Sequence, residues 1–254
     1  MEEKWERLRA YFAEHPKVLL GFSGGVDSAF LLAAARACGA EAVPVFIQTP
    51  FQPAFEWRDA EKLAGSLGVK PERVTASPLT DEDIVANGPR RCYYCKRMLF
   101  SLLREKADAL GATLIDGTNA SDPEDDRPGM QALRELGADS PLRLAGFTKA
   151  DIRTESHRMG LFTWDKPSYA CLATRVPTGT PLDAGTLQKV EKAEDALFQL
   201  GYKDFRVRVF HGAARVQLLK ADWPDEEQRD KILSALKPYF DLVLLDMTLR
   251  QVRE

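Results

Sequence analysis

The segment from Ser23 to Ser28 combines residue types that bind phosphate groups. It reads Ser-Gly-Gly-Val-Asp-Ser and directly follows a short apolar run at 17–22. Such a run predicts a buried strand, and the leucine- and alanine-rich stretch after the segment predicts a helix. At a strand-to-helix junction, unpaired backbone N–H groups and the positive end of the helix dipole favour an anion. Gly24 and Gly25 let the backbone close on a phosphate, and the two serines add hydroxyl donors.

This phosphate loop differs from two widespread phosphate-binding motifs. It lacks the Gly-Lys-Ser/Thr ending of a Walker A loop, and its glycines are not spaced as Gly-x-Gly-x-x-Gly. It instead resembles the PP-loop of the ATP pyrophosphatases, which include NAD and GMP synthetases and tRNA thiolation enzymes. That resemblance implies that the loop binds the β- and γ-phosphates of ATP, which leave together as pyrophosphate, and that Asp27 serves a Mg²⁺ ion or orients the site. A glycine turn that only ends a strand is the alternative.

Four cysteines in a chain of this length indicate metal or redox chemistry in a reducing compartment more than a disulfide framework. Cys92 and Cys95 lie among basic residues just before a predicted helix, where thiolates are favoured, and Cys171 lies in a loop rich in Pro and Gly. Three thiolates can bind a 4Fe-4S cluster with one iron left open, whereas structural zinc usually takes four ligands. A zinc site or simple burial is the alternative. Cys38 ends an alanine-rich helix and is predicted to pack in the core.

Apolar runs alternate with helical patterns along most of the chain. This order predicts an α/β domain over residues 1–178, with a doubly wound parallel sheet and right-handed crossovers. Residues 179–254 predict a small α+β domain. Strands are expected at about 17–22, 41–47, 73–77, 112–116, 142–146, 205–210, 213–219 and 241–247, and helices at about 27–38, 56–67, 96–110, 183–200 and 224–236.

Polar residues follow the strand predicted at 112–116. Ligands of doubly wound sheets bind at the carboxyl ends of the strands, where the three cysteines could also converge. Asp116 and Asn119 are therefore candidates for nucleotide or magnesium binding. An Asp-Gly turn without a ligand is the alternative.

Charge and composition limit the partners that we expect this chain to bind. The residues are 44% hydrophobic and 29% charged, and the formal net charge is -3. No overall positive field therefore favours nucleic acid, and we expect no nucleic-acid partner. No run of about 18 apolar residues occurs, and the N-terminus lacks the basic-then-apolar pattern of a secretory signal. We therefore expect no membrane partner and a cytoplasmic location.

A longer series of motifs resembles the LarE family of ATP-dependent sulfur transferases over nearly the whole chain. In sequence order these are the phosphate loop and residues 92–96, 116–119, 127–129, 140–142, 148–149, 170–173, 206–208 and 214–215. The resemblance implies that ATP and Mg²⁺ adenylate a carboxylate of pyridinium-3,5-dicarboxylate mononucleotide, a small-molecule nucleotide substrate. The product is a thiocarboxylate for the nickel-pincer nucleotide cofactor.

Members of this family obtain the sulfur in two ways. Some sacrifice one cysteine, which leaves dehydroalanine, and others carry a transferable sulfide on a 4Fe-4S cluster. With Cys92, Cys95 and Cys171 the sequence resembles the second kind, and the resemblance implies that all three are metal ligands with catalytic roles. It also implies a homo-oligomer, and an external sulfide donor that would recharge the sulfur.

The resemblance gives roles to several charged residues as well. Arg206, Arg208 and Arg215 would bind a substrate phosphate or lie at a subunit interface, and Arg175 is a further phosphate candidate, because guanidinium forks bind phosphate with two bonds. Glu194 would contact a metal or the substrate. A solvated sheet face for the arginines and a helix-surface salt bridge for the glutamate are the alternatives.

Two other functions and two departures from the family stay open. A tRNA-thiolating PP-loop enzyme would also use ATP, although the sequence shows no evident RNA-binding appendage. A non-catalytic nucleotide-binding or zinc-stabilised module is the other alternative. The C-terminal tail at 247–254 departs from the family pattern, and Thr174 stands where serine is commoner, so the substrate contacts of these parts are in doubt.

Overall fold

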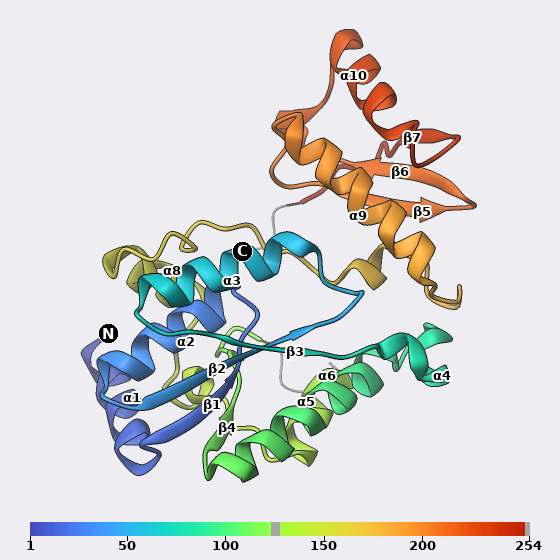
Figure 1. The fold of residues 1–254 in the computed structure, drawn as a ribbon. Coiled ribbons are helices and arrows are strands. Elements are labelled where there is room, and N and C mark those ends of the chain that lie inside the picture. Colours follow the sequence, from blue (N-terminus) through green and yellow to red (C-terminus); the bar gives the residue numbers. More distant parts are fainter. Residues whose placement is uncertain (123–127, 252–254) are drawn as a thin grey trace. The chain divides into compact units, whose positions relative to one another are not determined.

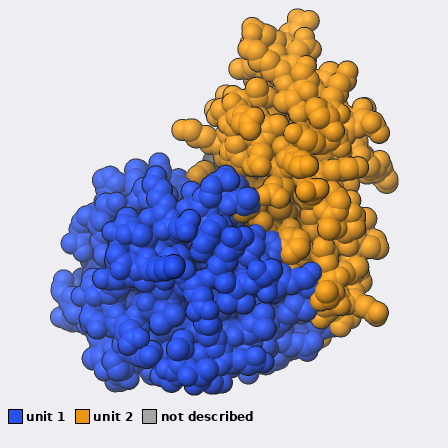
Figure 2. Space-filling view, in the orientation of Figure 1, with its two compact units in different colours: residues 1–49, 54–77, 92–166 blue, residues 50–53, 78–91, 167–254 orange. Residues whose placement is uncertain are grey.

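The computed structural model describes residues 1–122 and 128–251, so Arg127, the first residue of the motif at 127–129, lies outside the described residues. The chain forms two compact units (Figure 2). The first unit consists of residues 1–49, 54–77 and 92–166, and the second of residues 50–53, 78–91 and the chain from 167 onward. Within the described ranges, no helix has both the length and the apolar character needed to span a membrane.

The first unit is built on a four-stranded parallel sheet (Figure 1). Its strands lie in the order β3 (Glu72–Thr75), β2 (Glu41–Gln48), β1 (Lys17–Gly21) and β4 (Thr113–Ile115). The middle residues of β1, Val18, Leu19 and Leu20, are fully buried because helices cover both faces of the sheet. This arrangement confirms the predicted α/β fold with a parallel sheet.

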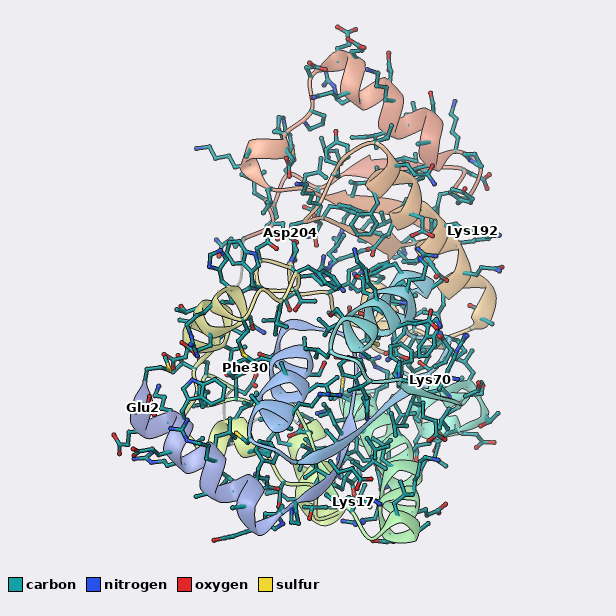
Figure 3. All side chains as sticks on the ribbon, turned by 60° about the vertical axis from the view of Figure 1, so that its left-hand side comes forward. Glu2, Lys17, Phe30, Lys70, Lys192 and Asp204 are labelled. Carbon is teal, nitrogen blue, oxygen red and sulfur yellow. The ribbon has the colours of Figure 1, made fainter. Side chains whose placement is uncertain are left out.

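Helices pack on the two faces of this sheet in two hydrophobic clusters. The helices of the unit are α1 (Glu2–Glu14), α2 (Val26–Ala37), α3 (Ala54–Ser66), α5 (Arg91–Leu110), α6 (Pro128–Glu135), α7 (Pro141–Leu144) and α8 (Lys149–Arg158). Phe30 of α2 lies in the larger cluster, 5.7 Å from the ring of Trp5 and 5.3 Å from that of Phe147 (Figure 3). Leu103 and Ala107 of α5 belong to the other cluster. The sheet is therefore sandwiched between helices.

The helix that carries the Cys-Tyr-Tyr-Cys motif begins earlier than predicted. It begins at Arg91 and not at residue 96, so Cys92 and Cys95 lie in helix α5 and not in a loop before it. Pro89 closes the preceding turn, and no glycine or proline interrupts the chain from there to the end of the helix. Nothing in the local sequence therefore delays the helix until after the cysteines.

The strand predicted at 142–146 is wrong. Residues Pro141–Leu144 form the short helix α7, whose first position is the proline. Proline suits that position because its φ is already helical and its missing N–H would have had no partner there. The pairing with β4 is made just before, by an isolated parallel bridge between Ile115 and Asp139.

The second unit contains a mixed three-stranded sheet. Strand β6 (Ala213–Gln217) pairs antiparallel with β5 (Arg206–Phe210) and parallel with β7 (Val243–Leu245). His211 and Gly212 join β5 to β6, and both have the positive φ that a two-residue hairpin turn requires. The other elements are α4 (Glu82–Val85), α9 (Ala184–Gln199), α10 (Glu226–Leu236) and the 3₁₀ turns at Pro78–Thr80, Leu172–Arg175 and Lys220–Asp222. This is the α+β arrangement predicted for the C-terminal part.

Asn87 attaches the segment 78–91 to the rest of the second unit. Its side-chain amide donates to the backbone carbonyls of Pro177 and Thr180 at 3.0 and 3.1 Å. Asn87 has a φ of 51°, a left-handed conformation that asparagine adopts more readily than most residues. The domain boundary predicted at residue 178 falls between these two acceptors, and that boundary stays a prediction.

Candidate functional site

The phosphate loop lies between β1 and α2, at the carboxyl edge of the parallel sheet. Gly24 has a φ of +69°, and a Cβ on this residue would lie 2.9 Å from backbone atoms of Ala60 in α3, so glycine is required. The Ser28 hydroxyl donates to the carbonyl of Gly25 at 3.2 Å and lies 3.2 Å from the hydroxyl of Ser23. These contacts arrange two hydroxyls and the first N–H groups of α2 around one place, which suits an anion.

A pocket of about 540 Å³ opens at this loop, a volume typical of small-molecule sites. All its lining residues belong to the first unit. They come from the loop and α2 (Ser23, Gly25, Asp27, Ser28), from α5 (Cys92, Lys96, Phe100), from the turn after β4 (Asp116, Gly117, Thr118, Asp122), and from Gly21, Pro128, Gly129 and Met130. The structure thus places Cys92, a predicted ligand of the iron–sulfur cluster, in the same pocket as the predicted phosphate site.

Asp27 makes an ion pair on the wall of this pocket. Its Oδ2 accepts from the Lys149 ammonium at 2.6 Å, and its Oδ1 accepts from the side-chain amide of Asn119 at 3.3 Å. Burial raises the pKa of the Asp27 carboxyl above its ordinary value, although the charge and hydrogen bond of Lys149 act in the opposite direction. Asn119 is therefore linked to the phosphate loop through Asp27.

Asp116 is a buried carboxylate that shapes the turn after β4. It accepts hydrogen bonds from the Thr118 hydroxyl at 2.5 Å and from the Ser140 hydroxyl at 2.6 Å. In the same turn, a Cβ on Gly117 would lie 3.1 Å from the backbone nitrogen of Ser28. The turn is thus closely packed against the phosphate loop, and the predicted role of Asp116 toward nucleotide or magnesium stays a prediction.

The three candidate cysteines are divided between the two units. Cys92 is exposed and Cys95 is half-buried, and both belong to the first unit. Cys171 is half-buried in the second unit, where the Arg91 guanidinium donates to its sulfur at 3.5 Å. Within residues 1–122 and 128–251, no three His, Cys, Asp or Glu side chains are placed together to bind a metal ion. The convergence of the three thiols stays a prediction.

Arg175 and Glu194 form a buried pair in the second unit. Two guanidinium nitrogens lie 2.7 and 3.0 Å from the two carboxylate oxygens, and both side chains are at most 1% exposed. Glu194 also accepts from the backbone N–H of Val207 at 2.9 Å and from the Tyr169 hydroxyl. The pair therefore connects α9, β5 and the loop around Cys171. A role of Glu194 as a metal ligand stays a prediction and would require this pairing to be given up.

The other candidate arginines lie on the sheet of the same unit. Arg206 donates to the Ser168 carbonyl at 2.6 Å, and Arg208 donates to the Thr174 carbonyl at 2.8 Å. Burial, followed by the neighbouring charges of Arg175 and Arg250, lowers the pKa of Arg206 to about 10. Repulsion between neighbouring arginines is thus the second cause of the lowered pKa after burial, and an anion placed among them would relieve it.

Arg215 is the outermost of the candidate arginines. Its side chain is 35% exposed, lies 3.2 Å from the Asp246 carboxylate and stacks over the ring of Phe210 at 5.1 Å. The exposed guanidinium leaves both predicted roles, phosphate binding and a subunit interface, as predictions.

Comparison with known proteins decides the family. No protein-family model matches the chain. An uncharacterized protein of Synechocystis sp. is 38% identical over 220 residues, which are 86% of this chain and 82% of the relative. The pyridinium-3,5-bisthiocarboxylic acid mononucleotide synthase of Lactiplantibacillus plantarum is 35% identical over 208 residues, which are 81% of this chain and 75% of the synthase. The chain belongs to the family of this synthase, the LarE family.

Membership of the LarE family confirms the resemblance seen in the motifs. An uncharacterized protein of Methanocaldococcus jannaschii is also similar, with 27% identity over 227 residues, 89% of this chain and 87% of the relative. The iron–sulfur type within the LarE family stays a prediction, as do the roles of the individual site residues.

Sequence reasoning gave no role to three residues that contact the candidate site, although Lys149 belongs to the motif at 148–149. Lys149 pairs with Asp27, Arg91 donates to Cys171, and Tyr169 bonds to Glu194. One of them carried a signal in the sequence. A lysine opens α8, although the first turn of a helix favours acidic residues, so its position calls for a separate explanation.

Proposed function

We propose that this LarE-family chain is an AMP-forming, ATP-dependent sulfur transferase acting on pyridinium-3,5-dicarboxylate mononucleotide. A carboxylate oxygen of the substrate attacks the α-phosphorus of ATP, and pyrophosphate leaves. A sulfur nucleophile then attacks the acyl carbon of the adenylate, and AMP leaves to give the thiocarboxylate. The observation that carries the proposal is the pocket shared by the phosphate loop and Cys92, in a chain 35% identical to a synthase of this product class.

The phosphate loop would bind the β- and γ-phosphates, using its serine hydroxyls and the N–H groups that begin α2. Asp27 fits a Mg²⁺ ion that accompanies ATP, because its carboxylate lines the pocket and Mg²⁺ on a nucleotide needs only one or two protein carboxylates. When bound, the ion would offset the charge of the triphosphate during the displacement.

Cys92, Cys95 and Cys171 would bind a 4Fe-4S cluster. The first two lie three residues apart in α5, so their side chains project from the same side of the helix, as two ligands of one group require. The Arg91 hydrogen bond to Cys171 suits a sulfur that carries negative charge. The cluster would supply a sulfide on its open iron, and an external sulfide donor would restore it. Sacrifice of Cys171 itself is the alternative source of sulfur.

The second unit would bind the phosphate of the substrate nucleotide. Arg206 and Arg208 lie near other arginines whose charges, after burial, lower the pKa of both, and the Arg215 side chain is partly exposed. A guanidinium donates two bonds to one phosphate, which a lysine cannot do. We also propose that the chain works as a homo-oligomer, as the family resemblance implies.

The test measures iron and acid-labile sulfide in protein purified without oxygen. We expect about four irons per chain, lost in each of the variants Cys92→Ala, Cys95→Ala and Cys171→Ala. The matched control is Cys38→Ala, which removes a half-buried cysteine at the end of α2 and should retain the iron. Iron-free active protein that acquires dehydroalanine at position 171 would establish the sacrificial route and refute the cluster.

The substrate is tested by pyrophosphate release. We expect release from ATP only when the pyridinium dicarboxylate nucleotide is present. Release that depends on bulk tRNA would refute the proposed substrate and favour tRNA thiolation. ATP binding without release under any of these conditions would refute an enzymatic role.

A further inference from the structure

The strongest unexplained contact near the phosphate loop joins two residues 122 positions apart in the sequence. The Lys149 ammonium lies 2.6 Å from Oδ2 of Asp27, and their side chains are only 22% and 28% exposed. Asp27 lines the pocket at the loop, so this ammonium lies at the pocket wall. A lysine has a flexible four-carbon stem and can move its charge over several ångströms.

Hydrogen bonds fix the backbone of Lys149 at the start of α8. Thr148 caps α8, and its hydroxyl and backbone nitrogen are bonded reciprocally with Asp151. The backbone N–H of Lys149 also donates to the Ser121 hydroxyl at 2.9 Å. The first turn of a helix disfavours a cation, so the helix itself gains nothing from a lysine at this position. The contact with Asp27 is therefore the feature that accounts for the lysine.

This contact occupies the carboxylate that the proposed Mg²⁺ ion would use. Oδ2 accepts from Lys149, and Oδ1 accepts from the Asn119 amide, so each oxygen of Asp27 already faces a donor. A divalent ion bound to Asp27 would repel the Lys149 ammonium, which lies 2.6 Å from Oδ2 of the same carboxylate. The two cations therefore exclude each other at Asp27, while the phosphates that arrive with the metal provide a new anionic partner for the lysine.

We propose that Lys149 is an exchangeable counter-ion of the phosphate loop. Its ammonium neutralises Asp27 in the nucleotide-free protein, leaves when Mg²⁺–ATP binds, and then pairs with the phosphates. This inference rests on the proposed ATP site. It makes Lys149 a positioning residue that holds the Asp27 carboxylate in place before the nucleotide arrives.

The experiment measures binding of Mg²⁺ with α,β-methylene ATP by calorimetry in four proteins. These are the wild type, Lys149→Met, Asp27→Asn and the double variant. The Lys149→Met variant should bind roughly ten- to hundredfold more weakly, the range expected for loss of a charge-assisted contact. The matched control is Lys17→Met, because Lys17 also pairs with a carboxylate, Glu41 at 3.2 Å, but at the opposite end of β1 (Figure 3).

The double variant tests the exchange itself. Either single variant removes the Asp27–Lys149 ion pair and therefore also the energetic cost of breaking it on binding. The double variant saves this cost once, whereas the sum of the two single effects counts the saving twice. If the pair is broken on binding, the double variant loses more affinity than the product of the two single losses, by about three- to tenfold. A double variant whose loss of affinity equals the product of the two single losses would mean that the pair persists in the complex, and this would overturn the inference. Unchanged binding by Lys149→Met would also overturn it. A wild type that does not bind the analogue at all would refute the proposed function, and the inference with it.

Discussion

Replacement of Gly24 by alanine tests how closely the phosphate loop is fixed. Two costs apply at this position. An L-residue at a φ of +69° costs about 1–2 kcal/mol. The added methyl would also lie 2.9 Å from the backbone of Ala60, which cannot turn aside as a side chain could, and such overpacking costs about 1–3 kcal/mol. We expect Gly24→Ala to lower the free energy of unfolding by about 2–5 kcal/mol and to abolish ATP binding.

The control for this prediction lies at the other end of the same helix. Gly39 follows α2 with a φ of +83°, and a Cβ there would meet nothing within 4 Å. Gly39→Ala should therefore cost only the conformational part, about 1–2 kcal/mol, and leave ATP binding unchanged. Urea unfolding and calorimetric titration with ATP measure both effects. Equal losses of stability in the two variants would show that the contact with Ala60 does not restrict the loop.

Two further predictions concern other parts of the chain. Glu194→Gln leaves the buried Arg175 guanidinium without its counter-charge and should cost about 3–5 kcal/mol in urea unfolding, whereas Glu227→Gln, in an exposed pair, should cost less than about 1 kcal/mol. Hydrogen bonds from Lys4 and Thr148 outweigh partial burial and lower the pKa of Asp151 from 3.8 to about 2. Its stabilisation is present above pH 4 and is lost as the pH falls through 2, so Asp151→Asn should be less stable than wild type at neutral pH, and this difference should shrink as the pH is lowered from 4 through 2.

The sheet and its phosphate loop were predictable because their signals are local. After Lys17, the run at 18–22 has no polar residue on either face, which is typical of a strand buried on both sides. Gly24 and Gly25 follow it at once, so the position of the loop at the carboxyl edge came from the order of the chain alone. The first turn of α5 was missed because its helix begins directly after a turn, with no capping residue that marks the start.

The partners of the charged residues were not predictable in the same way. Glu194 was taken as a surface residue of a helix or a ligand, yet it is the buried counter-ion of Arg175. Lys149 and Asp27 are 122 positions apart, and periodicity contains no information on which distant side chains meet. Such pairs depend on how the elements pack, so only coordinates identify them.

The hydrogen bonds of Asn87 have a consequence for the order in which the chain can fold. Its acceptors, Pro177 and Thr180, are made some 90 residues after it, and a ribosome adds about 5–20 residues per second. For several seconds after segment 78–91 has been synthesised, the Asn87 amide therefore lacks these two acceptors. A chain interrupted at residue 166 would lack these carbonyls together with most of the second unit. Helix α5 begins at Arg91, the last residue of this segment, and Arg91 donates to Cys171, so this contact of the first turn forms only after residue 171 has been synthesised.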